Sequence, residues 1–141
     1  NILHAAMSGP SAMNSQPWEI YVVTNEDKLK QLRKVAKYSN YVSPLAIVVA
    51  GNMNKALPGE MKDFWIQDCS AVTENILLSV ASQNLGAVWC GIYPIKEYVN
   101  SLQTCLNLSK EIIPLNIIYI GHPKNIVTPR DQFNLEKIHR I

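Results

Sequence analysis

Residues 61–85 constrain the fold more than any other segment, because they contain neither proline nor glycine and form the longest helix candidate in the chain. Apolar residues recur there at steps of three and four, the spacing of one helix face. Further apolar residues widen that face until most of the circumference is apolar, which predicts a core helix or one that also forms an interface. We expect Gly86 to end the helix as a left-handed residue. The face consists of Trp65, Cys69, Val72, Ile76 and Val80, widened by Phe64, Ala71, Leu77, Leu78 and Ala81.

Four short apolar runs predict β-strands, because they are rich in β-branched and aromatic residues and are bounded by turn residues. Asn25 is a suitable N-cap for a helix that ends near Lys37. A second short helix is expected after Pro94, and the chain from His122 onward reads as an extended polar tail. Four strands with intervening helices predict an α+β or α/β sandwich with one long helix at its centre. The expected strands are 18–24, 45–50, 87–93 and 112–121, the short helices are 26–37 and 95–107, and the loop is 51–60.

Composition limits the classes of function. A chain of 141 residues is the length of one domain, and 48% apolar against 17% charged residues suggests additional buried surface, most simply a subunit interface. The formal net charge of +2 is too small, and the basic residues too scattered, to indicate nucleic-acid binding. No secretory signal is visible, and no apolar run approaches the roughly 18 residues that span a bilayer. Cys69, Cys90 and Cys105 lack metal-ligand spacing and read as reduced thiols of a cytoplasmic protein.

The most informative short segment is the polar loop 10–18, which lies between an apolar helical stretch and the first strand. Prolines near both ends restrict its backbone. Ser11, Asn14, Ser15 and Gln16 offer groups that both donate and accept hydrogen bonds. Such a loop suits the edge of a neutral heterocycle, a sugar hydroxyl or a phosphate. On composition alone, the simpler interpretation is a capped connection whose side chains satisfy the neighbouring backbone.

Familiar catalytic constellations are missing. His4, His122 and His139 lie far apart in sequence, so a metal site is not expected. Asp68 and Glu74 fall within the apolar helix, where a partnered structural role is the simpler interpretation. The Gly-rich fingerprints of phosphate-binding loops are also absent. An enzyme without side-chain catalysts would take its chemistry from a bound cofactor.

Four segments, in order along the chain, resemble the nitroreductase family of FMN-dependent oxidoreductases. Residues 10–18 resemble its Pro-Ser-x-x-Asn-x-Gln-Pro-Trp signature, and residues 68–78 resemble its central helix. Residues 85–94 are similar to its strand and flavin-facing turn, and residues 120–139 to its C-terminal arm. The resemblance implies an α+β, nitroreductase-like sandwich, in which a mostly antiparallel sheet is flanked by helices and the long helix mediates dimerisation.

The same resemblance assigns roles to individual residues. It implies a homodimer with two FMN sites at the interface, where flavin N5 carries the chemistry. Gly91 would allow close approach of the backbone to the flavin, and Arg130 would bind its phosphate. Three aromatic residues, Tyr41, Phe64 and Trp65, are candidates for the substrate pocket, although Phe64 and Trp65 could equally be plain core residues. The cofactor-binding residues implied are Pro10, Ser11, Asn14, Gln16, Gly91, Tyr93, Pro94 and Arg130.

The chain starts at Asn1 inside an apolar helical pattern, so we expect residues 1–141 to be a single domain that lacks an N-terminal helix and the family's basic FMN-binding motif. By the same resemblance, Gln132 stands where many members of the family have a second Lys or Arg that binds the phosphate. The activity implied is ping-pong hydride transfer, in which NADH or NADPH is the reductant and a nitroaromatic or a quinone is the acceptor. The alternative is a dimeric flavin-binding or redox-sensing relative with little turnover.

Overall fold

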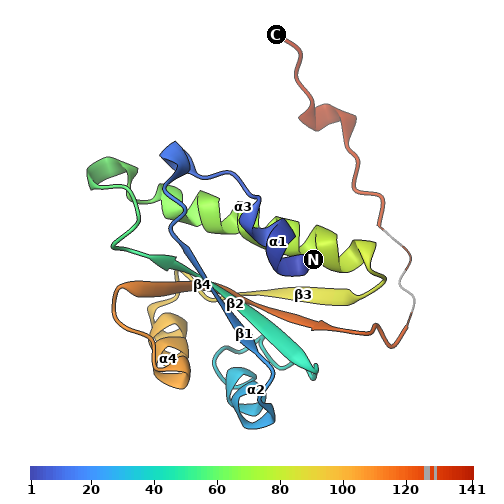
Figure 1. The fold of residues 1–141 in the computed structure, drawn as a ribbon. Coiled ribbons are helices and arrows are strands. Elements are labelled where there is room, and N and C mark those ends of the chain that lie inside the picture. Colours follow the sequence, from blue (N-terminus) through green and yellow to red (C-terminus); the bar gives the residue numbers. More distant parts are fainter. Residues whose placement is uncertain (126–127, 129) are drawn as a thin grey trace.

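The computed structural model describes residues 1–125, 128 and 130–141 of the chain. Its centre is an antiparallel sheet of four strands in the order β1-β2-β4-β3 (Figure 1). Helices pack on both faces of this sheet, which confirms the predicted α+β sandwich. The strands are β1 (Trp18–Val23), β2 (Leu45–Asn52), β3 (Gly86–Gly91) and β4 (Ile112–Gly121); the helices are α1 (Ile2–Met7), α2 (Glu26–Leu32), α3 (Phe64–Ser82) and α4 (Lys96–Leu106). Short 3₁₀ turns cover Ala12–Asn14, Gly59–Met61 and Leu135–Lys137.

The central strands β2 and β4 carry apolar residues on both faces, because helices cover both sides of the sheet. In β2, Ile47 and Val49 face the core beneath α1 and α3, whereas Ala46 and Val48 face the core against α2 and α4. Strands buried on both faces read as continuous apolar runs, which is why their sequences were recognisable. Figure 1 shows α1 and α3 on one side of the sheet and α2 and α4 on the other.

The long helix forms as predicted but is shorter, running from Phe64 to Ser82. Its sheet-facing side chains are buried, while Leu78 stays 60% exposed and Phe64 40% exposed. This leaves an apolar outer surface, in agreement with the expectation of a helix that has more than one apolar side. Within the residues that the structure describes, no helix has both the length and the apolar character needed to cross a bilayer.

Two predicted helix ends were wrong. Helix α2 ends at Leu32 instead of Lys37: the Val35 amide and the buried Ser39 hydroxyl both donate to the Leu32 carbonyl, at 3.1 and 3.2 Å, and satisfy that helix end. Helix α3 is ended by Asn84, which has φ of 58°, whereas Gly86 begins β3. The Leu85 amide then donates to the carbonyl of Val80 at 3.2 Å, the bond of a Schellman motif.

Candidate functional site

The loop between α1 and β1 has an unusual backbone. Met13, Asn14 and Gln16 have φ of 49°, 55° and 45°, a left-handed region that residues other than glycine rarely occupy. Local hydrogen bonds support this conformation: the Gln16 amide donates to Ser11 Oγ at 3.1 Å, and Gln16 Nε2 donates to Asn14 Oδ1 at 3.2 Å. Clusters of such residues persist where the surroundings impose them and are common at ligand sites.

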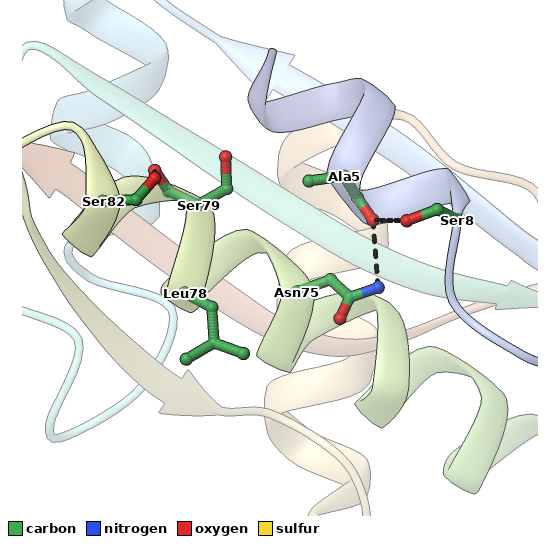
Figure 2. A pocket seen from close by; sticks show the side chains of 6 residues that line it. All are labelled: Ala5, Ser8, Asn75, Leu78, Ser79 and Ser82. Carbon is green, nitrogen blue, oxygen red and sulfur yellow. Dashed lines mark hydrogen bonds between the residues drawn. The ribbon is translucent and has the colours of Figure 1, made fainter.

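Side chains of helix α3 hydrogen-bond to this loop and to α1. The Asp68 carboxylate, only 5% exposed, accepts a hydrogen bond from the Ala12 amide at 2.8 Å. Seven residues along the helix, Asn75 Nδ2 donates to the carbonyl of Ala5 at 3.0 Å, and the Ser8 hydroxyl donates to the same oxygen (Figure 2). Two side chains of α3 therefore fix α1 and the start of the loop. The structural role expected for Asp68 is confirmed, whereas Glu74 is exposed.

A first hollow lies where the loop meets the beginning of α3. It has a volume of about 360 Å³. Three of the sequence-predicted residues, Pro10, Ser11 and Phe64, line it together with Asp68. Asn14 and Gln16 lie further along the loop and are exposed to solvent. This region brings together the polar loop and one predicted pocket aromatic.

The second group of predicted residues lies at the end of β3, where the chain turns away from the sheet. The amides of Ile92 and Tyr93 both donate to the carbonyl of Leu115, at 3.0 and 3.1 Å. That carbonyl is available because the β2–β4 register shifts at this point, which also accommodates Pro114 in a central strand. The irregular backbone of β4 thus fixes the turn that follows Gly91.

Tyr93 packs its ring edge-on against Trp65, with centroids 5.0 Å apart. Trp65 is only 2% exposed and belongs to the core beneath α3. Its burial supports the core alternative rather than a place in an open pocket. The Tyr93–Pro94 peptide bond is cis, and Pro94 is exposed.

A second hollow of about 170 Å³ opens beside Gly91. A β-carbon placed on Gly91 would meet no heavy atom within 4 Å, so the backbone faces open space there. Tyr41 lines the same hollow, which places a predicted pocket residue beside a predicted cofactor-binding residue. The remaining lining residues are Ala36, Tyr38, Trp89, Cys90 and Tyr98.

Ser39, which the sequence analysis did not single out, anchors the segment that carries Tyr41. Its buried hydroxyl lies 2.8 Å from the hydroxyl of Tyr119 while it also donates to the Leu32 carbonyl. The Tyr41 ring packs against the Tyr119 ring at 5.9 Å. Burial raises the pKa of Tyr119 to about 12, so its hydroxyl stays protonated and can donate to Ser39. Only the fold reveals this arrangement, because these residues are far apart in sequence.

Arg130 lies on the C-terminal arm, away from both hollows. The described residues from His122 onward are exposed, and Figure 1 shows the red arm leading away from the sheet. Pro129, part of the C-terminal motif, lies outside the described residues. The structure thus places the predicted residues in three regions of one chain: loop 10–16 with Phe64, the surroundings of Gly91 with Tyr41, and the arm.

The other ionisable candidates are the histidines, cysteines and carboxylates. Within the described residues, no three His, Cys, Asp or Glu side chains gather as a metal site would require. Cys69, Cys90 and Cys105 are free thiols. Burial raises the pKa of Cys69 to about 12, which removes thiolate chemistry near neutral pH.

The α+β sandwich of this chain is shared with solved structures. An NADH oxidase, provisionally named, from Clostridium acetobutylicum superposes with a TM-score of 0.91 and 40% identity, covering 98% of this chain and 83% of that chain. A protein from Bacteroides thetaiotaomicron, named provisionally as an NADH dehydrogenase/NAD(P)H nitroreductase, gives 0.91 and 33%, over 99% of this chain and 80% of that chain.

Sequence comparison gives the family. The model of the Nitroreductase family matches residues 1–44 and 41–122. A protein of Methanothermobacter thermautotrophicus, also provisionally named NADH dehydrogenase/NAD(P)H nitroreductase, is 38% identical over 98% of this chain and 72% of its own length. The chain therefore belongs to the Nitroreductase family.

Proposed function

We propose that this protein is an FMN-dependent oxidoreductase that uses NAD(P)H to reduce electron-poor acceptors such as nitroaromatics or quinones. The observation that carries the proposal is the open backbone at Gly91, which adjoins a hollow lined by aromatic side chains. Flat heterocycles bind well to concave, mostly apolar sites with a few fixed polar groups. The relatives named as NAD(P)H oxidoreductases support the same class of activity.

The residues present fit FMN. A bare backbone at Gly91 leaves room for an isoalloxazine ring to lie against the chain. The Ser11 hydroxyl accepts from the Gln16 amide and keeps its own proton, so it can still donate to a flavin or a ribityl oxygen. Asn14 and Gln16 present amide groups from a backbone held in place by Asp68. We assign the phosphate to Arg130, whose guanidinium can bind two oxygens at once.

A homodimer would complete the site. Loop 10–16 lies with α3 on one side of the sheet, whereas the hollow beside Gly91 is lined by Ala36, Cys90 and Tyr98, which pack in the core on the other side. One chain does not bring the two groups together, so a second copy would supply the missing half. The exposed apolar surface agrees with such pairing: Leu3, Met7, Phe64 and Leu78 on α1 and α3, and Phe133, Leu135 and Ile138 on the arm, are all at least 39% exposed.

Bound FMN would supply the hydride-transfer chemistry. The chain's own residues would bind the flavin, orient it and exclude water from it. The turn at 91–94 is rigid because two of its amides are bonded to Leu115, so it would hold a ring in a fixed plane. Reductant and acceptor would occupy the exposed face of that ring in turn, as a ping-pong reaction requires. The three free thiols agree with a reducing cytoplasmic location.

Absorption spectroscopy of purified protein mixed with FMN and freed of excess tests the proposal. A retained visible flavin band that NAD(P)H bleaches, followed by steady turnover with a quinone, is the expected result. Bleaching without turnover would favour the flavin-binding or redox-sensing alternative. Failure to retain flavin would refute the cofactor assignment.

Two arginines of the arm offer a matched test of the phosphate site. Arg130→Gln should weaken FMN binding at least tenfold, because it removes charge-assisted hydrogen bonds worth about 1.5–3 kcal/mol. Arg140→Gln, also on the exposed arm, should leave FMN affinity unchanged. Equal affinity of the two variants would remove Arg130 from the site.

A further inference from the structure

The surface of α2 and the turn after it is strongly basic. Residues 26–40 contain five lysine or arginine residues and two carboxylates, Glu26 and Asp27, both in the first turn of α2, so four of the five cations come after the acidic turn by two residues or more. Four of these cations and one amide surround a surface hollow of about 630 Å³, the largest of the hollows described here. Its lining residues are Lys30, Arg33, Lys34, Lys37 and Asn40.

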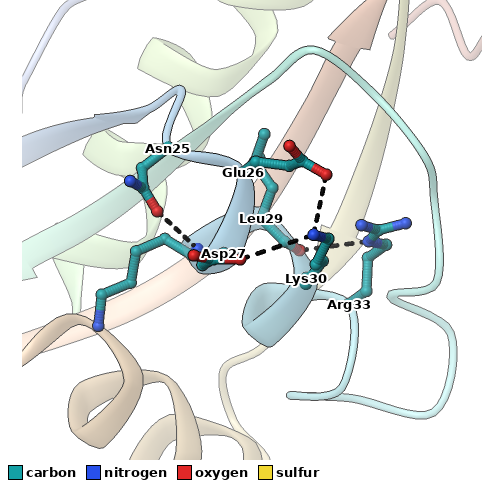
Figure 3. Close-up of polar contacts among 7 residues, drawn as sticks. Asn25, Glu26, Asp27, Leu29, Lys30 and Arg33 are labelled. Carbon is teal, nitrogen blue, oxygen red and sulfur yellow. Dashed lines mark hydrogen bonds and ion pairs between the residues drawn. The ribbon is translucent and has the colours of Figure 1, made fainter.

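The cations of this surface differ in how far neighbours neutralise them. Lys30 lies 2.8 Å from the carboxylate of Glu26 and 3.6 Å from that of Asp27 (Figure 3). Lys28 Nζ donates to the carbonyl of Cys105 at 2.7 Å and so points toward α4. Lys30 is therefore paired with two carboxylates, and the positive charge without an ion-pair partner belongs to the other three cations of the hollow.

Arg33, Lys34 and Lys37 carry that charge. Arg33 uses Nε to donate to the Leu29 carbonyl at 3.3 Å, which orients its guanidinium and leaves the terminal nitrogens for another acceptor (Figure 3). Lys37 Nζ lies 5.3 Å from the centre of the Tyr38 ring. In the described part of the chain, these three side chains form no ion pair within 4.0 Å.

The basic hollow adjoins the aromatic hollow through one segment of chain. Along residues 36–41, Lys37 and Asn40 line the basic hollow, whereas Tyr38 and Tyr41 line the hollow beside Gly91. The buried Ser39 fixes this segment through its bonds to Leu32 and Tyr119. A ligand that joins an aromatic ring to phosphate groups would therefore find a site for the ring and a cationic site at a fixed distance from each other.

We propose that the basic hollow binds the phosphate groups of the reductant, and that the protein consequently prefers NADPH over NADH. This inference rests on the proposed function, because it assigns the aromatic hollow to the redox site. NADPH differs from NADH by one additional phosphate on the adenosine ribose, and three cations that form no ion pair in the described part of the chain favour the more highly charged nucleotide. The site is open to solvent, so salt screens this attraction.

Binding of a redox-inactive probe tests the proposal without requiring flavin. Calorimetric titration should show 2′-phospho-ADP-ribose binding about tenfold more tightly than ADP-ribose at low ionic strength, and the difference should shrink in 0.5 M salt (roughly a 4 Å Debye length). Lys34→Gln with Lys37→Gln should abolish the difference. Both residues are exposed, so the variant should fold normally. Lys62→Gln with Lys110→Gln removes the same charge from exposed positions elsewhere and should preserve the difference.

Equal affinity for the two probes, or equal loss in both double variants, would overturn the assignment even if the protein bound FMN and oxidised NAD(P)H. Conversely, probe discrimination that depends on Lys34 and Lys37 would support the phosphate site in a protein that retained no flavin. The probe titration thus tests the phosphate site, whereas the flavin absorption experiment tests the proposed function, and either one can fail without the other.

Discussion

Gly91→Ala should separate flavin binding from stability. A β-carbon at this position meets no atom within 4 Å, and Gly91 does not have a positive φ. An alanine there therefore causes neither a clash nor backbone strain. Because glycine in a strand loses more conformational entropy on folding than alanine, the variant should be more stable by about 0.5–1 kcal/mol. Urea unfolding followed by circular dichroism measures this difference.

The same methyl group should weaken FMN binding if the isoalloxazine lies against this backbone. The added bond extends about 1.5 Å into the space that the ring would occupy. Displacing the ring by that distance loses van der Waals contacts along its face, each worth roughly 0.1–0.2 kcal/mol per atom pair. We therefore expect the FMN dissociation constant to rise about tenfold, measured by titrating flavin-free protein and following the quenching of flavin fluorescence.

Gly86→Ala is the matched control, because Gly86 begins the same strand and has no positive φ. Its added methyl would lie 3.5 Å from Pro123 Cβ, an ordinary contact. This variant should keep the wild-type affinity for FMN. Unchanged affinity in Gly91→Ala, or the same loss in both variants, would refute the assignment of Gly91 to the flavin surface.

Three further substitutions test the framework of the site. Gly51→Ala would push a methyl group into the ring of the buried Trp65, and it should lower the free energy of unfolding by about 1–3 kcal/mol in urea titrations; a change below about 0.5 kcal/mol would contradict this. Asp68→Ala leaves the Ala12 amide without its acceptor and should cost about 1–3 kcal/mol by the same assay, whereas Asp68→Asn should retain most of the stability because its carbonyl can accept. The pKa of Cys69 is about 12 when folded against about 9 when unfolded, so stability relative to Cys69→Ala should be constant below pH 9 and decline as pH rises toward 12; a decline that starts near neutral pH would be inconsistent with burial of the thiol.

The sequence predicted the sheet well because packing on both faces imposes an apolar pattern that can be read locally. All four strands were found, with their ends shifted by a few residues. Strand β4 is instructive, because Pro114 argues against a central strand. The structure accommodates it by a register shift opposite Val49 and Ala50, a feature of two paired strands that one segment cannot reveal.

Helix ends were harder to predict because they depend on partners that are distant in sequence or on residues other than glycine. The last carbonyl of α2 accepts from the hydroxyl of Ser39, seven residues beyond Leu32, although Val35 and Ala36 continue the helical apolar spacing. The ends of α3 and α4 use Asn84 and Asn107, with φ of 58° and 54°. Asparagine tolerates this left-handed region, so Asn84 could have been predicted as the residue that ends α3 in place of Gly86.

The candidate site could be predicted as a set of residues but not as an arrangement in space. Loop 10–16 is held by Asp68 on the side of α3, whereas Tyr41 and Gly91 meet in a hollow that borders the core of α2 and α4. No periodicity within the sequence encodes that separation, because it follows from the order in which the strands join the sheet. If both groups serve one flavin, they must come from two copies of the chain. The apolar outer face of α3 and the exposed arm then have a common physical explanation: each is surface that one copy alone cannot bury.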